Sequence, residues 1–257
     1  MLFDDDPRDM RKKRFIEECR RRRARELLSP LSEKILAWER DEIDSGEVFS
    51  AAEHAARRGK ALVADFRKRP DVILAGIAMD ENRYITGIGG IGVEVRLADI
   101  MDVFSDSIVS PVEVDGSMAK GVAPAIRERG GGEIEDEAKA GAPVGPGKAL
   151  STGPGSLTTG NVIHVSLYDG SGSITPASVT ASAGAALAEA ESLEAETVVM
   201  PGLGFFEGGI GPEESAAALV EAIGSHAGES VGKVLLVDLD EKMVDAFVSE
   251  LEKIDGE

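Results

Sequence analysis

The residues whose types and spacing most clearly suggest a chemical role lie in one stretch, "ETVVMPGLGFFEGGIGPEESAAALVEAI", from Glu196 to Ile223. A β-branched run leads through Pro201 into a glycine-rich segment, and an alanine-rich helical pattern follows it. A glycine-rich loop between a strand and a helix exposes successive backbone N–H groups, and the helix adds the positive end of its dipole. Glycine also permits the close approach of a ligand. The stretch therefore predicts a loop that binds an anion such as a phosphate.

Two other glycine-rich segments are weaker candidates. Residues 87–92, "GIGGIG", have the spacing of a dinucleotide-binding fingerprint, but they lead into "VEVRL", which alternates like a strand. Because that fingerprint needs a helix at this point, we interpret the segment as a hairpin or linker. The segment "GAPVGPGKAL" resembles a P-loop with its spacing off by one, and Ala149 replaces the Ser or Thr that would bind magnesium.

Histidine and cysteine give no sign of a metal site. His54, His164 and His226 are scattered along the chain, and each is interpreted as structural. The single cysteine, Cys19, excludes an internal disulfide and a thiolate-rich zinc site within one chain. We expect no metal and no cofactor.

The charge of the chain is strongly acidic and unevenly distributed. The formal net charge is −19 over 257 residues. Residues 1–90 hold nineteen Lys and Arg against eighteen Asp and Glu, whereas residues 91–257 hold nine against twenty-nine. The acidic second part argues against binding to a nucleic-acid backbone. The composition resembles that of proteins from salt-loving microbes, and a highly soluble acidic domain is the alternative.

No membrane or export signal is visible in the sequence. The N-terminus "MLFDDDPRDM" lacks a basic region followed by an apolar run, and no segment approaches eighteen continuous apolar residues. We expect a soluble, cytoplasmic protein that does not contact a membrane.

The N-terminal third is predicted to be helical. Residues 7–70 carry apolar residues at helical spacing, with breaks at 29–30 and at 44–46. A basic cluster on the first helix, Arg20 to Arg23 with Arg25, has glutamates at pairing distance, so pairing within the helix is the plain interpretation. A contact with a partner or a nucleic acid is the alternative, although no interleaved aromatic residues favour single-strand binding. The apolar positions outnumber what a helical pair can bury, which favours a homo-oligomer.

Beyond this region, strand-like and helical runs alternate. The predicted strands are "GVEVRLAD", "DSIVSPVEV", "GKALSTGPG", "NVIHVSL", "ETVVMPG" and "KVLLVDL", and the predicted helices are "GVAPAIRERGG", "TPASVTASAGAALAEAESL", "PEESAAALVEAIGSH" and "DEKMVDAFVSELEKI". This alternation is typical of an α/β domain with helices on both faces of a sheet. We expect a helical region over residues 1–85 and an α/β domain over residues 86–257.

The order of these motifs resembles the macro domain, an α/β module that binds ADP-ribose. The resemblance rests on "RLADIMDVFSDSIVSP", on "EVDGSMAKGVAPAIRERGGG", and on "NVIHVSL" followed by "VVMPGLGFFEGGIGPEESAAALVEAI". These segments span about residues 93–250. The resemblance implies a three-layer α/β/α sandwich with a mixed sheet, preceded here by the helical region.

The resemblance also implies a role for particular residues. Asp99 would accept a hydrogen bond from the adenine amino group, and the Ile100 N–H would face the ring. Ser110 and Glu113 would lie near the distal ribose. Backbone N–H groups would hold the diphosphate, and the residues concerned are Gly121, Val122, Gly202, Leu203, Gly204, Phe205, Phe206, Glu207, Gly208 and Gly209.

Several residues depart from the family pattern. Glu113 stands where many members have asparagine, and Lys120 in the first loop would pair with either a phosphate or Glu113. Phe205 and Phe206 stand where small residues are usual, so they would narrow the pocket or stack on the ligand. Three hypotheses therefore stay open: binding of ADP-ribose or a related nucleotide, hydrolysis of an ADP-ribosyl or O-acyl-ADP-ribose substrate with Glu113 as base, and a filled fold that serves as an interaction module.

Overall fold

The computed structural model describes residues 81–206 and 209–255, together with residues 28, 31, 32, 34–38, 40 and 42–52. The chain divides into two compact units, Met1–Ala78 and Met79–Glu257. In the first unit, residues 34–38 and 45–52 are helical, and Asp44 Oδ1 accepts hydrogen bonds from the N–H groups of Gly46 and Glu47. The helix predicted after residues 44–46 is present over residues 47–52, and the rest of it lies outside the described residues. Cys19, His54 and the basic cluster at 20–25 lie outside the described residues.

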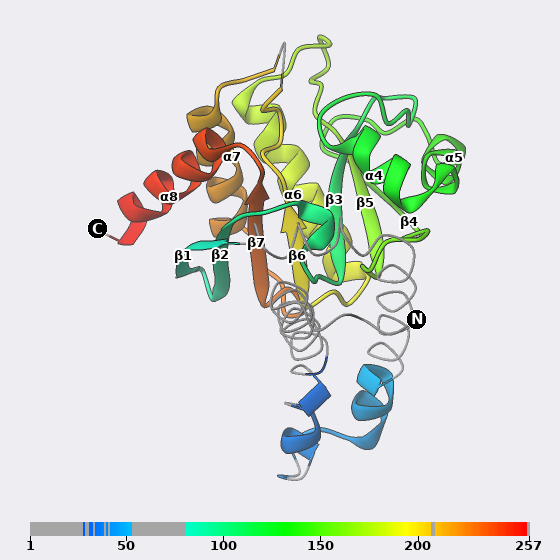
Figure 1. Ribbon diagram of the computed structural model, residues 1–257, viewed down its shortest axis with the longest axis vertical. Helices are drawn as coiled ribbons and strands as arrows, with labels where there is room; N and C mark the ends of the chain where they lie inside the picture. The colour runs from blue at the N-terminus through cyan, green and yellow to red at the C-terminus, as the bar shows by residue number, and fades with distance from the viewer. Residues whose placement is uncertain are drawn as a thin grey trace, which may run out of the picture. The chain divides into compact units, whose positions relative to one another are not determined.

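The second unit is built on a seven-stranded mixed sheet (Figure 1). Its strands, in sheet order, are β1 (Glu81–Ile88), β2 (Ile91–Leu97), β7 (Lys233–Asp238), β6 (Thr197–Met200), β3 (Ser107–Val112), β5 (Asn161–Ser166) and β4 (Ala149–Thr152). The five strands from β2 to β5 are parallel to one another. The two edge strands, β1 and β4, are antiparallel to their neighbours.

Helices cover both faces of the sheet. On one face lie α6 (Pro176–Ser192), α7 (Pro212–Gly224) and α8 (Glu241–Asp255); on the other lie the 3-10 helix η1 (Ile100–Asp102), α4 (Ala123–Gly130) and α5 (Gly132–Ala140) (Figure 1). Val198 packs in the first core and its neighbour Val199 in the second. The central strands are continuously apolar because successive side chains enter opposite cores.

Local signals in the sequence explain how several elements begin. Gly89 and Gly90 take positive φ values of 59° and 94° in the turn between β1 and β2, as a tight hairpin requires. The N-terminus of α6 has a reciprocal cap, in which Thr175 Oγ1 accepts the Ser178 N–H and Ser178 Oγ accepts the Thr175 N–H. Ser178 Oγ also donates to the Leu167 carbonyl, which ties α6 to the segment after β5.

The structure confirms the α/β/α architecture, the hairpin at residues 87–92, and every predicted strand and helix of the second unit. It adds α5, which the sequence analysis missed because "GEIEDEAKA" is mostly polar and buries only Ile134 and Ala138. It also shows that β1 pairs with β2 from Glu81 onward, so the boundary expected between residues 85 and 86 falls inside β1. Among the described helices, none has the length and apolarity of a membrane-crossing segment.

Candidate functional site

The edge at which the five parallel strands end collects the candidate residues. Two loops leave the sheet there: the first loop, residues 113–122, follows β3, and the second loop, residues 201–211, follows β6. Residues 207 and 208 of the second loop lie outside the described residues. Because β3 and β6 are neighbours in the sheet, the two loops start side by side. This is the edge where open α/β sheets bind ligands.

A small hollow lies at the end of β3. Its walls come from β3, both loops and the segment after β5, and they comprise Pro111, Val112, Glu113, Lys120, Leu167, Tyr168, Ile174 and Phe206. Pockets that enclose a small molecule measure roughly 300–1,000 Å³. The free space inside the hollow is about 10 Å³, about that of one water molecule, so the hollow would have to widen before it could enclose part of a ligand.

Three polar side chains meet in this hollow. The Tyr168 hydroxyl donates to Glu113 Oε1 across 3.2 Å, and Lys120 Nζ lies 3.2 Å from the same oxygen. Lys120 also donates to the Tyr168 hydroxyl, and its ammonium lies 5.2 Å from the centre of the Tyr168 ring. The hydrogen bond to Tyr168, and secondly that to Glu113, raise the pKa of Lys120. The hollow therefore holds a lysine cation beside a carboxylate and a phenol.

The second loop is closed by its own hydrogen bonds. The Phe205 N–H donates to the Gly202 carbonyl, and the N–H groups of Phe206 and Ile210 donate to the Gly204 carbonyl. The Gly209 N–H donates to the Phe206 carbonyl across 2.9 Å. A side chain at Gly209 would collide with the Gly204 carbonyl, so the loop can close this tightly only with glycine there. Three N–H groups expected to face a diphosphate, those of Phe205, Phe206 and Gly209, are thus bonded within the loop.

The two loops meet at Phe206 and Gly121. A Cβ on Gly121 would lie 3.6 Å from Phe206 Cδ1 and 3.3 Å from Pro111 Cγ. Phe205 and Phe206 are half-buried and pack against the core beneath α6 and α7. Phe206 therefore narrows the space between the loops.

The end of the first loop presents the N-terminus of α4. Gly121 has a φ of +57°, Val122 is the N-cap, and no side chain caps the first turn of α4. The N–H groups of Ala123 and Ala125 donate to the carbonyls of Lys120 and Val122, and Pro124 has no N–H. An anion here would therefore meet the N–H groups of Gly121 and Val122 and the positive end of the helix dipole. This geometry suits the diphosphate role that the resemblance implies for Gly121 and Val122.

Comparison with known proteins agrees with this geometry. The profile of the Macro domain family matches residues 109–219. The second unit of this chain belongs to the macro-domain family. A protein of Aquifex aeolicus is 36% identical over 156 residues, which is 60% of this chain and 94% of that protein. The chain spans only 40% of a Mycobacterium tuberculosis protein to which it is 30% identical over 145 residues.

Solved macrodomains share the fold. The Oceanobacillus iheyensis macrodomain with ADP gives a TM-score of 0.62 at 17% identity, over 69% of this chain and 98% of that one. The Trypanosoma brucei macrodomain in complex with ADP-ribose gives 0.56 at 14% identity, over 62% of this chain and 68% of that one. At such identities the likeness concerns the fold.

Asp99 caps η1 of the macro domain and is already held by two partners. Its Oδ1 accepts the Met101 N–H across 2.9 Å, and its Oδ2 lies 3.5 Å from Nη1 of Arg129, which also pairs with the buried Asp102. The Asp99 side chain is 24% exposed. A carboxylate oxygen can accept more than one hydrogen bond, so the adenine role stays a prediction. Ile100, beside it, is buried.

The other predicted residues lie deeper in the macro domain. Ser110 is fully buried within β3, and its hydroxyl has no hydrogen-bond partner among the described residues. Leu203 is fully buried, and the Gly202 N–H donates to Asp238 Oδ2 across 3.2 Å. Glu113 and Phe206 line the hollow, and Gly121 lies against Phe206 beside it. Glu207 and Gly208 lie outside the described residues.

Sequence reasoning missed three residues of this edge. Tyr168 lies two residues after β5, and its position beyond the carboxyl end of a parallel strand was the available signal. Arg129 lies at the end of α4, remote in sequence from Asp99, and nothing in the sequence indicated the pair. Asp238 ends β7 and anchors the second loop through Gly202, and burial raises its pKa.

No metal centre is assembled within the part of the chain that the structure describes, since no three His, Cys, Asp or Glu side chains gather there as ligands.

Proposed function

We propose that the macro domain binds ADP-ribose or a related nucleoside diphosphate at the carboxyl edge of its sheet. The contact between the first and second loops, at Gly121 and Phe206, carries the proposal, because it brings the N-terminus of α4 beside the polar hollow. The Oceanobacillus iheyensis and Trypanosoma brucei macrodomains, described with ADP and with ADP-ribose, support it through their common fold.

Each of three parts of the ligand would contact different residues. Asp99 would accept from the adenine amino group, with the Ile100 N–H facing the ring. The N–H groups of Gly121 and Val122 would bind the diphosphate. Glu113 and Tyr168 would bind hydroxyls of the distal ribose, because a carboxylate accepts hydroxyl hydrogen bonds and a phenol both accepts and donates them.

Lys120 would make a carboxylate compatible with a nearby diphosphate. Two like charges near one another repel, and a cation placed between them offsets that repulsion. Lys120 Nζ lies 3.2 Å from Glu113 Oε1, and a lysine has three donors to share between the carboxylate and a phosphate.

Ligand binding would require a rearrangement of the second loop. Phe206 lies against Gly121, and the N–H groups of Phe205, Phe206 and Gly209 donate within the loop. A diphosphate would exchange some of these hydrogen bonds for bonds to its own oxygens while Phe206 turns aside.

Calorimetric titration with ADP-ribose tests the proposal. It should be run in low and in high potassium chloride, because the acidic composition favours a chain adapted to a salt-rich cytoplasm. We expect micromolar binding that Asp99→Ala abolishes. Asp136→Asn, which removes an exposed carboxylate from α5, is the matched control and should bind like the wild type. No heat and no thermal shift up to millimolar ligand would refute nucleotide binding.

Hydrolysis of an ADP-ribosyl or O-acyl-ADP-ribose substrate is the second candidate. Glu113 is the observation that favours it, since a carboxylate in the hollow can activate a water molecule as general base. Glu113→Gln should abolish hydrolysis of the substrate, while ADP-ribose still binds. Equal turnover by the Glu113→Gln variant would exclude this role.

An interaction module is the third candidate, favoured by the closed second loop and by exposed Leu36, Trp38 and Phe49 in the N-terminal unit. Light scattering on the full chain and on residues 79–257 tests whether the helical region forms a homo-oligomer. A monomeric full chain would exclude the homo-oligomer.

A further inference from the structure

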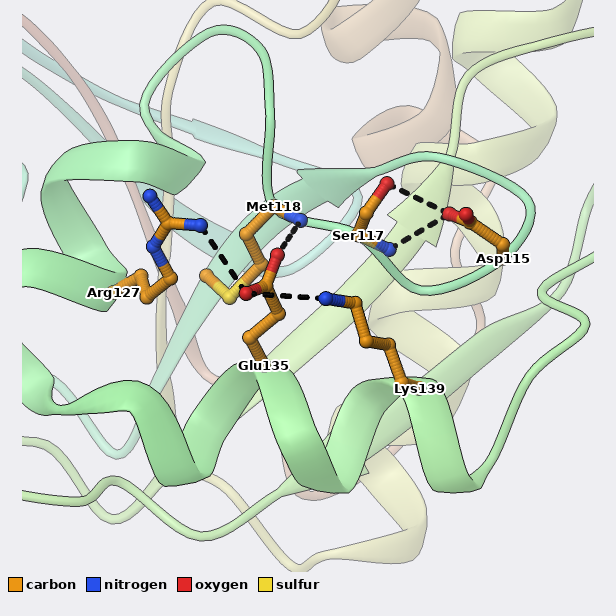
Figure 2. Close-up of polar contacts among 6 residues, drawn as sticks. All are labelled: Asp115, Ser117, Met118, Arg127, Glu135 and Lys139. Atoms are coloured by element: carbon orange, nitrogen blue, oxygen red, sulfur yellow. Dashed lines mark hydrogen bonds and ion pairs between the residues drawn. The ribbon is translucent and has the colours of Figure 1, made fainter.

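The first loop is held in a closed turn before it reaches the ligand site. The Glu113 N–H donates to the Ser117 carbonyl across 3.0 Å, and the Gly116 N–H donates to the Glu113 carbonyl across 2.9 Å. Asp115 Oδ1 accepts both the N–H and the hydroxyl of Ser117 (Figure 2). This turn fixes residues 113–117, but by itself it does not determine where Lys120 and Gly121 lie.

A glutamate on α5 holds the loop where it leaves this turn. Glu135 Oε1 accepts the Met118 N–H across 2.8 Å, and the side chain points from α5 toward the loop (Figure 2). Glu135 Oε2 lies 3.1 Å from Arg127 Nη1 on α4 and 3.3 Å from Lys139 Nζ on α5. The hydrogen bond from Met118, the largest influence, lowers the pKa of Glu135, and the two cations lower it further against partial burial.

The surroundings make this contact hard to replace. The Glu135 side chain is 13% exposed, and the Met118 side chain is fully buried among the residues beneath α4 and α5. Hydrogen bonds to a charged acceptor are stronger than those between neutral groups. If the carboxylate were removed, the Met118 N–H would lose its partner in a place with little access to water. A second contact also holds the first loop against α5: the loop passes so close to the helix that a Cβ on Gly116 would lie 2.6 Å from the Ala138 carbonyl.

We propose that Glu135 is the positioning residue of the ligand site. It sets the path of residues 118–122, and so it sets where the Lys120 ammonium and the Gly121 N–H stand relative to Tyr168 and to Phe206. The inference rests on the proposed function for the identity of the ligand, and the role of α5 in it is separate from any contact with that ligand.

The test uses the full chain with Glu135→Ala, Glu135→Gln and, as matched control on the same helix, Asp136→Asn. Two measurements need no ligand: hydrogen exchange of the Met118 amide, and the nuclear Overhauser effect between the Lys120 side chain and the Tyr168 ring. Two further titrations use ADP-ribose and AMP. AMP lacks the second phosphate and the distal ribose, the parts that the proposed function assigns to the first loop.

Glu135→Ala should speed exchange of the Met118 amide and weaken the Lys120–Tyr168 signal. It should raise the Kd for ADP-ribose about tenfold or more, with an effect on AMP of less than about threefold. Glu135→Gln keeps a carbonyl acceptor and should fall between Glu135→Ala and the wild type, and Asp136→Asn should match the wild type. Melting temperatures show which variants remain folded.

Unchanged Met118 exchange and ADP-ribose affinity in Glu135→Ala would overturn the inference. An equal loss for both ligands together with a lower melting temperature would also overturn it, since that pattern indicates general destabilisation. If the wild type binds neither ligand, the proposed function fails, while the exchange and proximity measurements still decide whether Glu135 positions the loop.

Discussion

Phe206 Cδ1 lies 3.6 Å from the point where a Cβ on Gly121 would stand. The pair joins two loops that leave adjacent parallel strands, β3 and β6, and it closes the space between them. Phe206 also lines the hollow that holds Glu113, Lys120 and Tyr168. A ligand that extends from the hollow along the N-terminus of α4 would therefore have to pass this contact.

Gly121→Val should abolish ADP-ribose binding in a folded protein. Gly121 has a φ of +57°, which costs a residue with a side chain roughly 1–2 kcal/mol, and the added methyl groups would press on Phe206 and Pro111. Calorimetry measures the binding, and circular dichroism checks the fold. Gly132→Ala is the control, because an added Cβ there meets nothing within 4 Å. Wild-type affinity in Gly121→Val would show that the ligand does not pass this point.

Phe206→Ala should tighten ADP-ribose binding severalfold, because the space between the loops opens without a rearrangement. The half-buried ring packs on the core, so its loss should cost about 1–3 kcal/mol of unfolding free energy. Titration calorimetry and urea denaturation give the two quantities. Phe205→Ala is the matched control in the same loop, since Phe205 does not line the hollow. Weaker binding by Phe206→Ala alone would mean that the ring stacks on the ligand.

His164 should stay neutral in the folded protein until the pH falls to about 4, because burial lowers its pKa from 6.5. In the unfolded chain it takes up a proton near pH 6.5, so between pH 6.5 and 4 the unfolded state binds more protons than the folded state. The contribution of His164 to stability is complete above pH 6.5 and falls progressively toward pH 4. An NMR titration of the imidazole measures the pKa directly, and a midpoint near 6.5 in the folded protein would contradict the prediction.

Glu191 should stabilise the fold in a lower pH range. Partial burial opposes its ionisation, but hydrogen bonds from His226 and from the N–H groups of Val231 and Ser230 outweigh it and lower the pKa from 4.5 to about 2. The stability it contributes is complete above about pH 4.5 and is lost as the pH falls toward 2.

Glu191→Gln tests this prediction by denaturation at several pH values. The variant should lose about 1–3 kcal/mol of unfolding free energy at pH 7, and its difference from the wild type should shrink toward pH 2. Glu128→Gln, which replaces an exposed glutamate on α4, should change little at either pH. If the loss of unfolding free energy in Glu191→Gln were the same at every pH, the shape of the Glu191 side chain rather than its charge would hold residues 228–231 in place.

Much of the fold was predictable because its signals are local. The apolar runs in β6 and β7 indicated buried parallel strands, and Gly89 with Gly90 indicated a hairpin. The anion-binding expectation for the segment after β6 came from its glycines. By contrast, α5 gave no such signal, because its helix buries only Ile134 and Ala138 and carries charge elsewhere.

The site was only partly predictable. The family resemblance named Glu113, Gly121 and Phe206, and their role in binding a ligand stays a prediction. The Lys120–Glu113 pair, one of the two pairings expected for Lys120, is present. Tyr168 was missed because it lies in a separate segment, after β5, and meets Glu113 only through the pairing of β3 with β5. Ser110 is fully buried inside β3, and its expected place near a ribose stays a prediction.

The sequence by itself determined the order of the strands and helices other than α5, the acidity of the second unit and the glycines that let two loops approach each other. These properties depend on residue type and on near neighbours along the chain. Only the tertiary structure decided which side chains share the hollow, that Arg129 holds Asp99, and that Glu135 holds the first loop. Those contacts join residues from different elements, and their distances follow from how α4 and α5 pack on the sheet and not from spacing in the sequence.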